Sequence, residues 1–181
     1  GTMTSGVDWL MFTGTQNGAA TGSSMSIRDV DGDGFDDVFL GAWGHDNGTT
    51  DSGAVYYFGG QHLVSDYSSG DNIMLTTTGV DSMLGEGKIV YGASAYVSLP
   101  HKLVSYSDAT CSNLGGIVAA TAHDKAAYHF TGATLSGLPE ESTTTSADQS
   151  ISEIDTTLFG ERGTSGDVTG DGVTDLILSD Y

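Results

Sequence analysis

Basic residues are scarce in this 181-residue chain. Lysine and arginine together number 5, against 24 aspartates and glutamates, and the formal net charge is −19. So few basic side chains cannot neutralise a phosphate backbone, which excludes nucleic acid as the main partner and argues against an anionic membrane surface. The acidity is therefore either solvated, as in proteins from salty environments, or partly neutralised by bound cations.

Cysteine, proline and long apolar runs are rare as well. The single cysteine, Cys111, cannot form an intramolecular disulfide, so we expect a buried, inert thiol. No run approaches the ~18 apolar residues of a membrane span, and no signal peptide is visible. The opening Gly1-Thr2-Met3 resembles a cloning remnant, so we expect that a signal segment has been removed. Two prolines beside 27 glycines, with many Ser and Thr, predict short strands joined by tight turns.

An acidic loop followed at once by an apolar strand occurs twice. Residues 29–37 have the sequence DVDGDGFDD and precede the apolar stretch 38–43, while residues 167–175 have the sequence DVTGDGVTD and precede 176–178. A glycine stands seven residues before each loop, at Gly22 and at Gly160. These matched spacings predict a chain built from repeats of one unit.

A second element recurs, and one repeat is degenerate. Short aromatic-rich strands that end at glycine occur at 52–60, 5–14 and 125–132. The middle repeat begins at Leu84-Gly85 and has its core strand at 116–120. Its loop, 108–113, has lost most of its carboxylates, and an insertion at 96–105 lengthens it, so we expect no metal there.

The pattern predicts an all-β chain. We expect strands near 7–12, 24–28, 37–43, 53–58, 72–77, 87–91, 115–121, 126–130, 150–155, 161–166 and 174–178. We expect loops at 61–71 and 136–149, and the pattern predicts no helix.

The acidic loops predict two calcium sites. Calcium prefers about six to eight oxygen ligands, which a short loop with alternating aspartates supplies. Asp-Gly pairs also form plain hairpin turns, but five carboxylates within the nine residues of the first loop would repel one another without a cation. The candidate ligands are the side chains of Asp29, Asp31, Asp33 and Asp37 with the carbonyl of Phe35, and the side chains of Asp167, Thr169, Asp171 and Asp175 with the carbonyl of Val173. Because Thr169 replaces a carboxylate with a hydroxyl, we expect the second loop to bind more weakly.

An EF-hand is excluded. That motif needs a bidentate glutamate at the twelfth loop position and a helix on each side. Leu40 and Leu178 occupy that position here, each within an apolar strand.

The stretch 22–60 resembles an FG-GAP repeat, the unit of the β-propellers of integrin α-subunits and of related bacterial proteins. The family's initial Phe-Gly has counterparts at Thr21-Gly22, Leu84-Gly85 and Phe159-Gly160, and its Gly-Ala-Pro has one at Gly41-Ala42-Trp43. The matches touch most of the chain, although only the first repeat is nearly complete. The resemblance implies blades of about four antiparallel strands, calcium between the first two strands of a blade, an extracellular or cell-surface setting, and a role in adhesion or ligand recognition.

The repeats predict a single domain of roughly 2.5–3 propeller blades. Residues 1–21 would supply a strand that completes a blade, 22–83 blade 1, 84–158 the degenerate blade 2, and 159–181 a partial blade 3. Propellers usually close with about four to eight blades. Two chains joined head to tail would give a six-bladed homodimeric ring; alternatively, the chain is an excerpt of a longer protein. Residues 8–13 also align with an outer fourth strand, which leaves their place in a blade open.

No catalytic set is identifiable. His45-Asp46 and His123-Asp124 recur at similar places, which favours polar turn residues over acid–base catalysis. Aromatic residues such as Trp43 and Tyr57 are expected to pack between blades. The leading interpretation is a non-catalytic, calcium-stabilised module for extracellular recognition or adhesion. The alternatives are a carbohydrate-binding lectin-type propeller, which an exposed Trp43 would favour, and an accessory part of a larger hydrolytic enzyme.

Overall fold

The computed structural model describes residues 9–66, 68–76, 79–80, 87–107, 115–121, 125–152 and 162–179. Within these residues the chain forms four β-sheets with a few short helices, which confirms the all-β class. None of the described sheets closes into a barrel, and their arrangement is consistent with partial propeller blades.

The first sheet has five strands in the order β11-β7-β4-β3-β2. They are β2 (Thr21–Arg28), β3 (Asp37–Ala42), β4 (Ala54–Phe58), β7 (Lys88–Tyr91) and β11 (Glu141–Thr143). Neighbouring strands are antiparallel, except that β11 joins β7 in parallel.

The second sheet is antiparallel, in the order β12-β10-β9-β8. Its strands are β8 (Lys102–Tyr106), β9 (Gly116–Ala120), β10 (Ala126–Thr131) and β12 (Gln149–Ser152).

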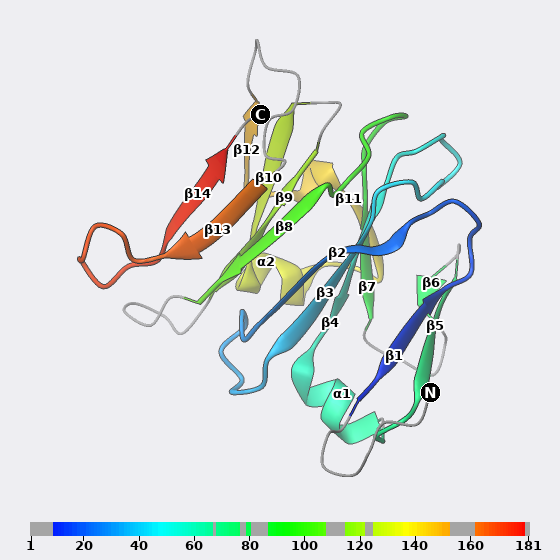
Figure 1. Ribbon diagram of the computed structural model, residues 1–181, viewed down its shortest axis with the longest axis horizontal. Helices are drawn as coiled ribbons and strands as arrows, with labels where there is room; N and C mark the ends of the chain where they lie inside the picture. Colours follow the sequence, from blue (N-terminus) through cyan, green and yellow to red (C-terminus); the bar gives the residue numbers. More distant parts are fainter. Residues whose placement is uncertain are drawn as a thin grey trace.

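Two smaller sheets lie at opposite ends of the molecule (Figure 1). A hairpin of β13 (Arg162–Gly166) and β14 (Asp175–Ser179) lies beside the second sheet. At the other end, β5 (Asn72–Thr76) pairs in parallel with β1 (Met11–Gly14) and antiparallel with β6 (Gly79–Val80). The molecule is therefore a row of sheets with β13–β14 at one end and β1–β5–β6 at the other.

The main core lies between the first and second sheets. Successive strand residues point to opposite faces, so Phe39 and Tyr57 lie on one face of the first sheet. There they pack in one hydrophobic cluster with Leu103 and Ile117 of the second sheet. These strands are rich in β-branched and aromatic residues, which fit a pleated surface that is buried on both faces.

Two further clusters extend the row. Leu40, on the opposite face of the first sheet, packs in a cluster with Ile73 and Leu75 of β5. Beyond the second sheet, Val118 of β9 belongs to a small cluster against which Leu178 of β14 packs.

The predicted loops at 61–71 and 136–149 were wrong, because both contain regular structure. The first contains most of α1 (Gly60–Asp66), whose Leu63 is buried in a hydrophobic cluster with the first sheet. In the second, α2 (Gly132–Gly137) extends into the predicted loop, and β11 and the 3₁₀ turn Thr144–Ser146 follow it. Helices this short gain little from propensity, so tertiary packing determines them.

The predicted insertion at 96–105 contains most of β8, a strand that sequence reasoning missed. A cis Leu99-Pro100 bond precedes it. Side-chain hydroxyls attach β8 to the first sheet: Ser24 Oγ accepts from the Leu103 N–H (2.8 Å), and Ser26 Oγ accepts from the Ser105 N–H (3.2 Å).

Two pairings differ from a simple blade. β7, which the sequence places with blade 2, pairs with β4, and β5 pairs with β1 instead of β4. The blade boundaries therefore stay a prediction.

Candidate metal centre

The first acidic loop joins β2 to β3 and is folded by its own carboxylates. Asp29 Oδ1 accepts from the Gly32 N–H at 2.8 Å, and Asp29 Oδ2 accepts from the Gly34 N–H at 3.1 Å. Gly32 and Gly34 have φ angles of 80° and 91°, a region that glycine enters without strain. The chain thus curls around the first aspartate of the loop.

Asp37 ends the loop as a fully buried carboxylate. Its Oδ2 accepts from the Val30 N–H and its Oδ1 from the Gly60 N–H, both at 2.9 Å. Burial, assisted by the charges of Asp31 and Asp33 and opposed by the two backbone hydrogen bonds, raises the pKa of the Asp37 carboxyl to about 6. A cation beside Asp37 would offset this electrostatic cost.

The structure brings three of the predicted ligands together. Asp29, Asp31 and Asp37 each offer one oxygen, and these atoms all lie within 4.8 Å of one another. No other group of three histidine, cysteine or acidic side chains in the described part of the chain meets this criterion. Oxygens that share one calcium at about 2.3–2.6 Å can lie at most about 5 Å apart, so the three residues fit the ion.

The other two candidate ligands of this loop, the Asp33 side chain and the Phe35 carbonyl, belong to residues at its exposed tip. Asp33 Oδ1 accepts from the Phe35 N–H at 2.8 Å, and Asp33 is not among the three grouped carboxylates. Their role as ligands stays a prediction.

The second acidic loop, between β13 and β14, repeats the hydrogen bonds of the first. Asp167 Oδ1 accepts from the Gly170 N–H (2.6 Å) and its Oδ2 from the Gly172 N–H (2.8 Å), as Asp29 does with Gly32 and Gly34. Asp175 Oδ2 accepts from the Val168 N–H at 2.9 Å, as Asp37 does from Val30. The two loops therefore share one design in sequence and in hydrogen bonding.

The flanking strands share the same register too. Arg28 pairs with Asp37 where β2 meets β3, and Gly166 pairs with Asp175 at the equivalent point of β13 and β14. Each hairpin closes its acidic loop at the same place.

The second loop is the more open of the two. Asp167 and Asp171 are exposed and Asp175 is half-buried, whereas Asp37 is fully buried. Backbone N–H groups, that of Gly172 foremost, hold the pKa of Asp167 below its ordinary value. With Thr169 at the place of Asp31, this loop has no group of three convergent carboxylates within the described residues.

Sequence reasoning missed two partners of the first loop. Asp36 Oδ1 accepts from the Asp29 N–H (3.0 Å), and Gly60 comes from the junction of β4 and α1. A Cβ at Gly60 would lie 2.4 Å from the Asp36 carbonyl oxygen, so only glycine fits there. The run Gly59-Gly60 directly after an aromatic strand was the sequence feature that could have indicated this close approach of the backbone.

His45 is a core residue rather than the expected polar turn residue. It is fully buried, its Nδ1 lies 3.2 Å from the Tyr56 hydroxyl, and its ring stacks on Tyr91. Burial lowers the pKa of His45, which favours the neutral imidazole. His123-Asp124, Cys111 and the degenerate loop 108–113 lie outside the described residues.

Residues 21–58 match the family model described as FG-GAP repeat. This stretch runs from the start of β2 to the end of β4 and includes the whole first acidic loop. Residues 21–58 are an FG-GAP repeat. The match confirms the resemblance on which the sequence analysis relied. FG-GAP repeats are non-catalytic structural and recognition motifs, typical of extracellular domains, and some bind calcium.

A comparison with curated proteins finds no match to this FG-GAP-containing chain. Among the described residues, none of the helices has the length and apolar character that crossing a membrane requires.

Proposed function

We propose that the acidic loop of the FG-GAP repeat binds calcium, and that the chain is a calcium-stabilised, non-catalytic β-propeller module for recognition or adhesion outside the cell. The observation that carries this proposal is the convergence of Asp29, Asp31 and Asp37, the last of which is fully buried.

In this proposal calcium acts as a folding ligand. Asp29, Asp31, Asp33 and Asp37 hold it with the Phe35 carbonyl, and the ion neutralises carboxylates that otherwise repel one another. Because Asp37 also accepts hydrogen bonds from Val30 and Gly60, the ion stabilises the junction of β2, β3 and α1. Calcium that binds only the folded chain adds its binding free energy to the free energy of unfolding.

A second, weaker site is proposed at Asp167, Thr169, Asp171 and Asp175 with the Val173 carbonyl. Its backbone repeats that of the first loop, but it has one fewer carboxylate and more solvent exposure. Extracellular calcium modules bind with dissociation constants of about 10⁻⁴–10⁻³ M, so a weak site is useful only where calcium is millimolar. This supports the proposed extracellular setting.

Calorimetric titration of the decalcified protein tests the proposal. We expect two calcium ions per chain: Asp29→Ala removes the tighter site, and Asp167→Ala the weaker. Asp36→Asn is the matched control, because it also removes one charge but keeps an oxygen for the Asp29 N–H. No calcium uptake at millimolar concentration, or uptake unchanged by Asp29→Ala, would refute it.

One observation favours carbohydrate binding as a second candidate. Trp43 is 37% exposed, and its ring lies 5.8 Å from that of His101, whereas Tyr56, Tyr57 and Phe58 are buried as expected for aromatics between sheets. An exposed tryptophan can stack on a sugar ring. A glycan array with and without chelator tests this, and Trp43→Ala should abolish any signal.

A further inference from the structure

Two interfaces inside the chain use the same pair of sheet faces. Phe39 marks the back face of the first sheet, which packs on the front face of the second sheet, marked by Ile117 and Ala119. The back face of the second sheet, marked by Val118, packs in turn against Leu178 of the β13–β14 hairpin. In both interfaces, therefore, the back face of one sheet packs on the front face of the next sheet in the row.

The repeat extends this rule to the hairpin. Leu178 stands eleven residues after Asp167, as Leu40 stands eleven after Asp29, so both belong to front faces. Ile177 is the counterpart of Phe39 and marks the back face of the hairpin. The register agrees, because Ile177 pairs with Thr164 where Phe39 pairs with Ser26.

The back face of the hairpin has no partner among the described residues. Ile177 is 43% exposed, whereas Phe39 is 0% exposed. Ile177 lines a shallow pocket of about 230 Å³ together with Thr164, Gly163, Ser179 and Arg162.

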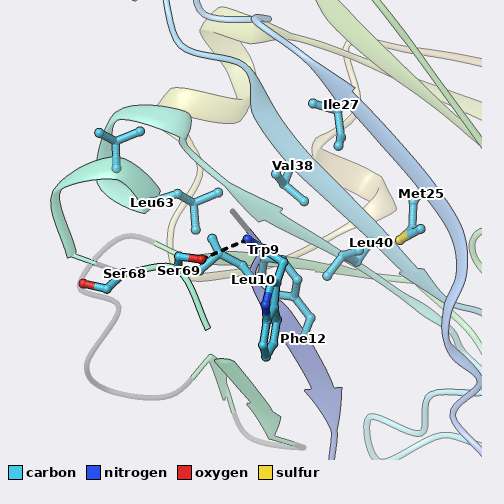
Figure 2. A pocket seen from close by; sticks show the side chains of 11 residues that line it. Trp9, Leu10, Phe12, Met25, Ile27, Val38, Leu40, Leu63, Ser68 and Ser69 are labelled. Carbon is cyan, nitrogen blue, oxygen red and sulfur yellow. Dashed lines mark hydrogen bonds between the residues drawn. The ribbon is translucent and has the colours of Figure 1, made fainter. Parts of the chain in front are cut away.

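The front face of the first sheet is only partly covered. β1 and β5 cover Leu40, but a groove of about 710 Å³ remains beside β2 (Figure 2). Met25 and Ile27, which line it, are 64% and 62% exposed, and Trp9 and Val64 line it as well. The groove is therefore the part of this front face on which no sheet of the described residues packs.

We propose that a second copy of this chain occupies the groove: the back face of its β13–β14 hairpin, centred on Ile177, packs against Met25 and Ile27. The β13–β14 hairpin lies at one end of the row (Figure 1), and the groove lies toward the other end, where residues of β1 and β2 line it, so each copy offers the face that the other lacks. The association is head to tail, and two copies close a ring with two identical interfaces.

The charge distribution supports this choice of partner. The residues that line the groove and the shallow pocket include no acidic side chain, and Arg162 is their one charged member. Copies that each carry a formal charge of −19 can meet only where acidic groups are sparse. Neither surface contains a candidate calcium ligand, so the proposal is independent of calcium binding.

Light scattering on the intact chain, at ionic strength that screens the net charge, tests the proposal. We expect twice the 18.6 kDa chain mass. Ile27→Lys and Ile177→Lys should each yield monomers with an unchanged far-ultraviolet circular dichroism spectrum. Ile151→Lys is the matched control, because Ile151 is 57% exposed on β12 and lines neither surface, so this variant should stay dimeric.

Mixing the two monomeric variants identifies the symmetry. A head-to-tail pair of Ile27→Lys with Ile177→Lys keeps one intact interface, so the mixture should recover dimers at high concentration. If two copies instead paired symmetrically through their β14 strands, mixing the two variants would not restore dimers. A monomeric wild-type chain, a dimer that both substitutions leave intact, or a mixture that stays monomeric overturns the proposal, and the wild-type mass decides even if a variant fails to fold.

Discussion

At Asp37, burial and negative charge meet in one side chain. The carboxylate has no solvent exposure, and two backbone N–H groups donate to it. Burial, and to a smaller extent two acidic neighbours, raise its pKa. An ordinary Asp-Gly turn needs no such residue. Asp37 is therefore the residue that most favours the proposed cation site over a simple turn.

Asp37→Asn should lower the free energy of unfolding by about 1–3 kcal/mol in calcium and weaken calcium binding. The amide nitrogen must replace one carboxylate oxygen and leaves the Val30 or the Gly60 N–H without its acceptor. Chemical denaturation in calcium measures the loss. Asp36→Asn, an exposed neighbour, should stay within ~0.5 kcal/mol of wild type. Equal losses in the two variants would contradict this account of Asp37.

Asp33→Ala should be more harmful than Asp171→Ala. Both residues occupy the same loop position, but the first loop has three convergent carboxylates and the second has Thr169 in place of Asp31. Thermal unfolding of both variants in millimolar calcium checks the order. The reverse order would show that the second loop is the tighter site.

His45 should make stability depend on pH. Its pKa is lowered by burial from 6.5, so below that pH the unfolded chain takes up a proton that the folded chain does not. Stability is therefore full above about pH 6.5 and falls as the pH drops, by up to ~1.4 kcal/mol per pH unit for this one group. Guanidinium unfolding at pH 7.5 and 5.5 should show a smaller loss in His45→Phe than in wild type; identical losses would mean that His45 does not contribute.

At the scale of elements, the acidic hairpin is the repeated unit. Its two copies match in hydrogen bonds, in strand register and in positive φ at paired glycines, Gly170 and Gly172 repeating Gly32 and Gly34. Local sequence specifies such a hairpin almost completely, which is why both copies could be predicted.

Gly34→Ala should destabilise the first loop through backbone strain alone. Its φ is 91°, and a Cβ there would meet nothing within 4 Å, so no steric clash contributes. The expected cost is about 1–2 kcal/mol, with weaker calcium binding. Gly34→Asn should cost less, because asparagine tolerates positive φ. The difference between the two variants in thermal unfolding is the measurement, and equal effects would refute the strain argument.

Elements fixed by distant contacts could not be predicted. α1 depends on burial of Leu63 against β5, and β8 depends on Ser24 and Ser26 of β2, some 79 residues away. The parallel pairing of β1 with β5 is equally non-local. Neither hydrophobic alternation nor turn residues carry such information.

At the scale of the whole molecule, the sheets form a row with a repeated packing rule. The sequence predicted the all-β class and the repeats, because alternation and glycine-rich turns are local signals. It placed β7 with blade 2, whereas β7 pairs with β4 of the first sheet, a contact that no local pattern specifies. The net charge of −19 is a global property that bound cations would reduce.

Thermal unfolding of the intact chain in calcium and in excess chelator tests the central claim, that calcium lies among the carboxylates of the first loop. At calcium about 100-fold above its dissociation constant, one site adds ~2.7 kcal/mol, or roughly 5–10 °C in a domain of this size. We predict a melting temperature higher in calcium by at least this margin, with most of the difference lost in Asp29→Ala. Superimposable melting curves in calcium and in chelator would contradict the account.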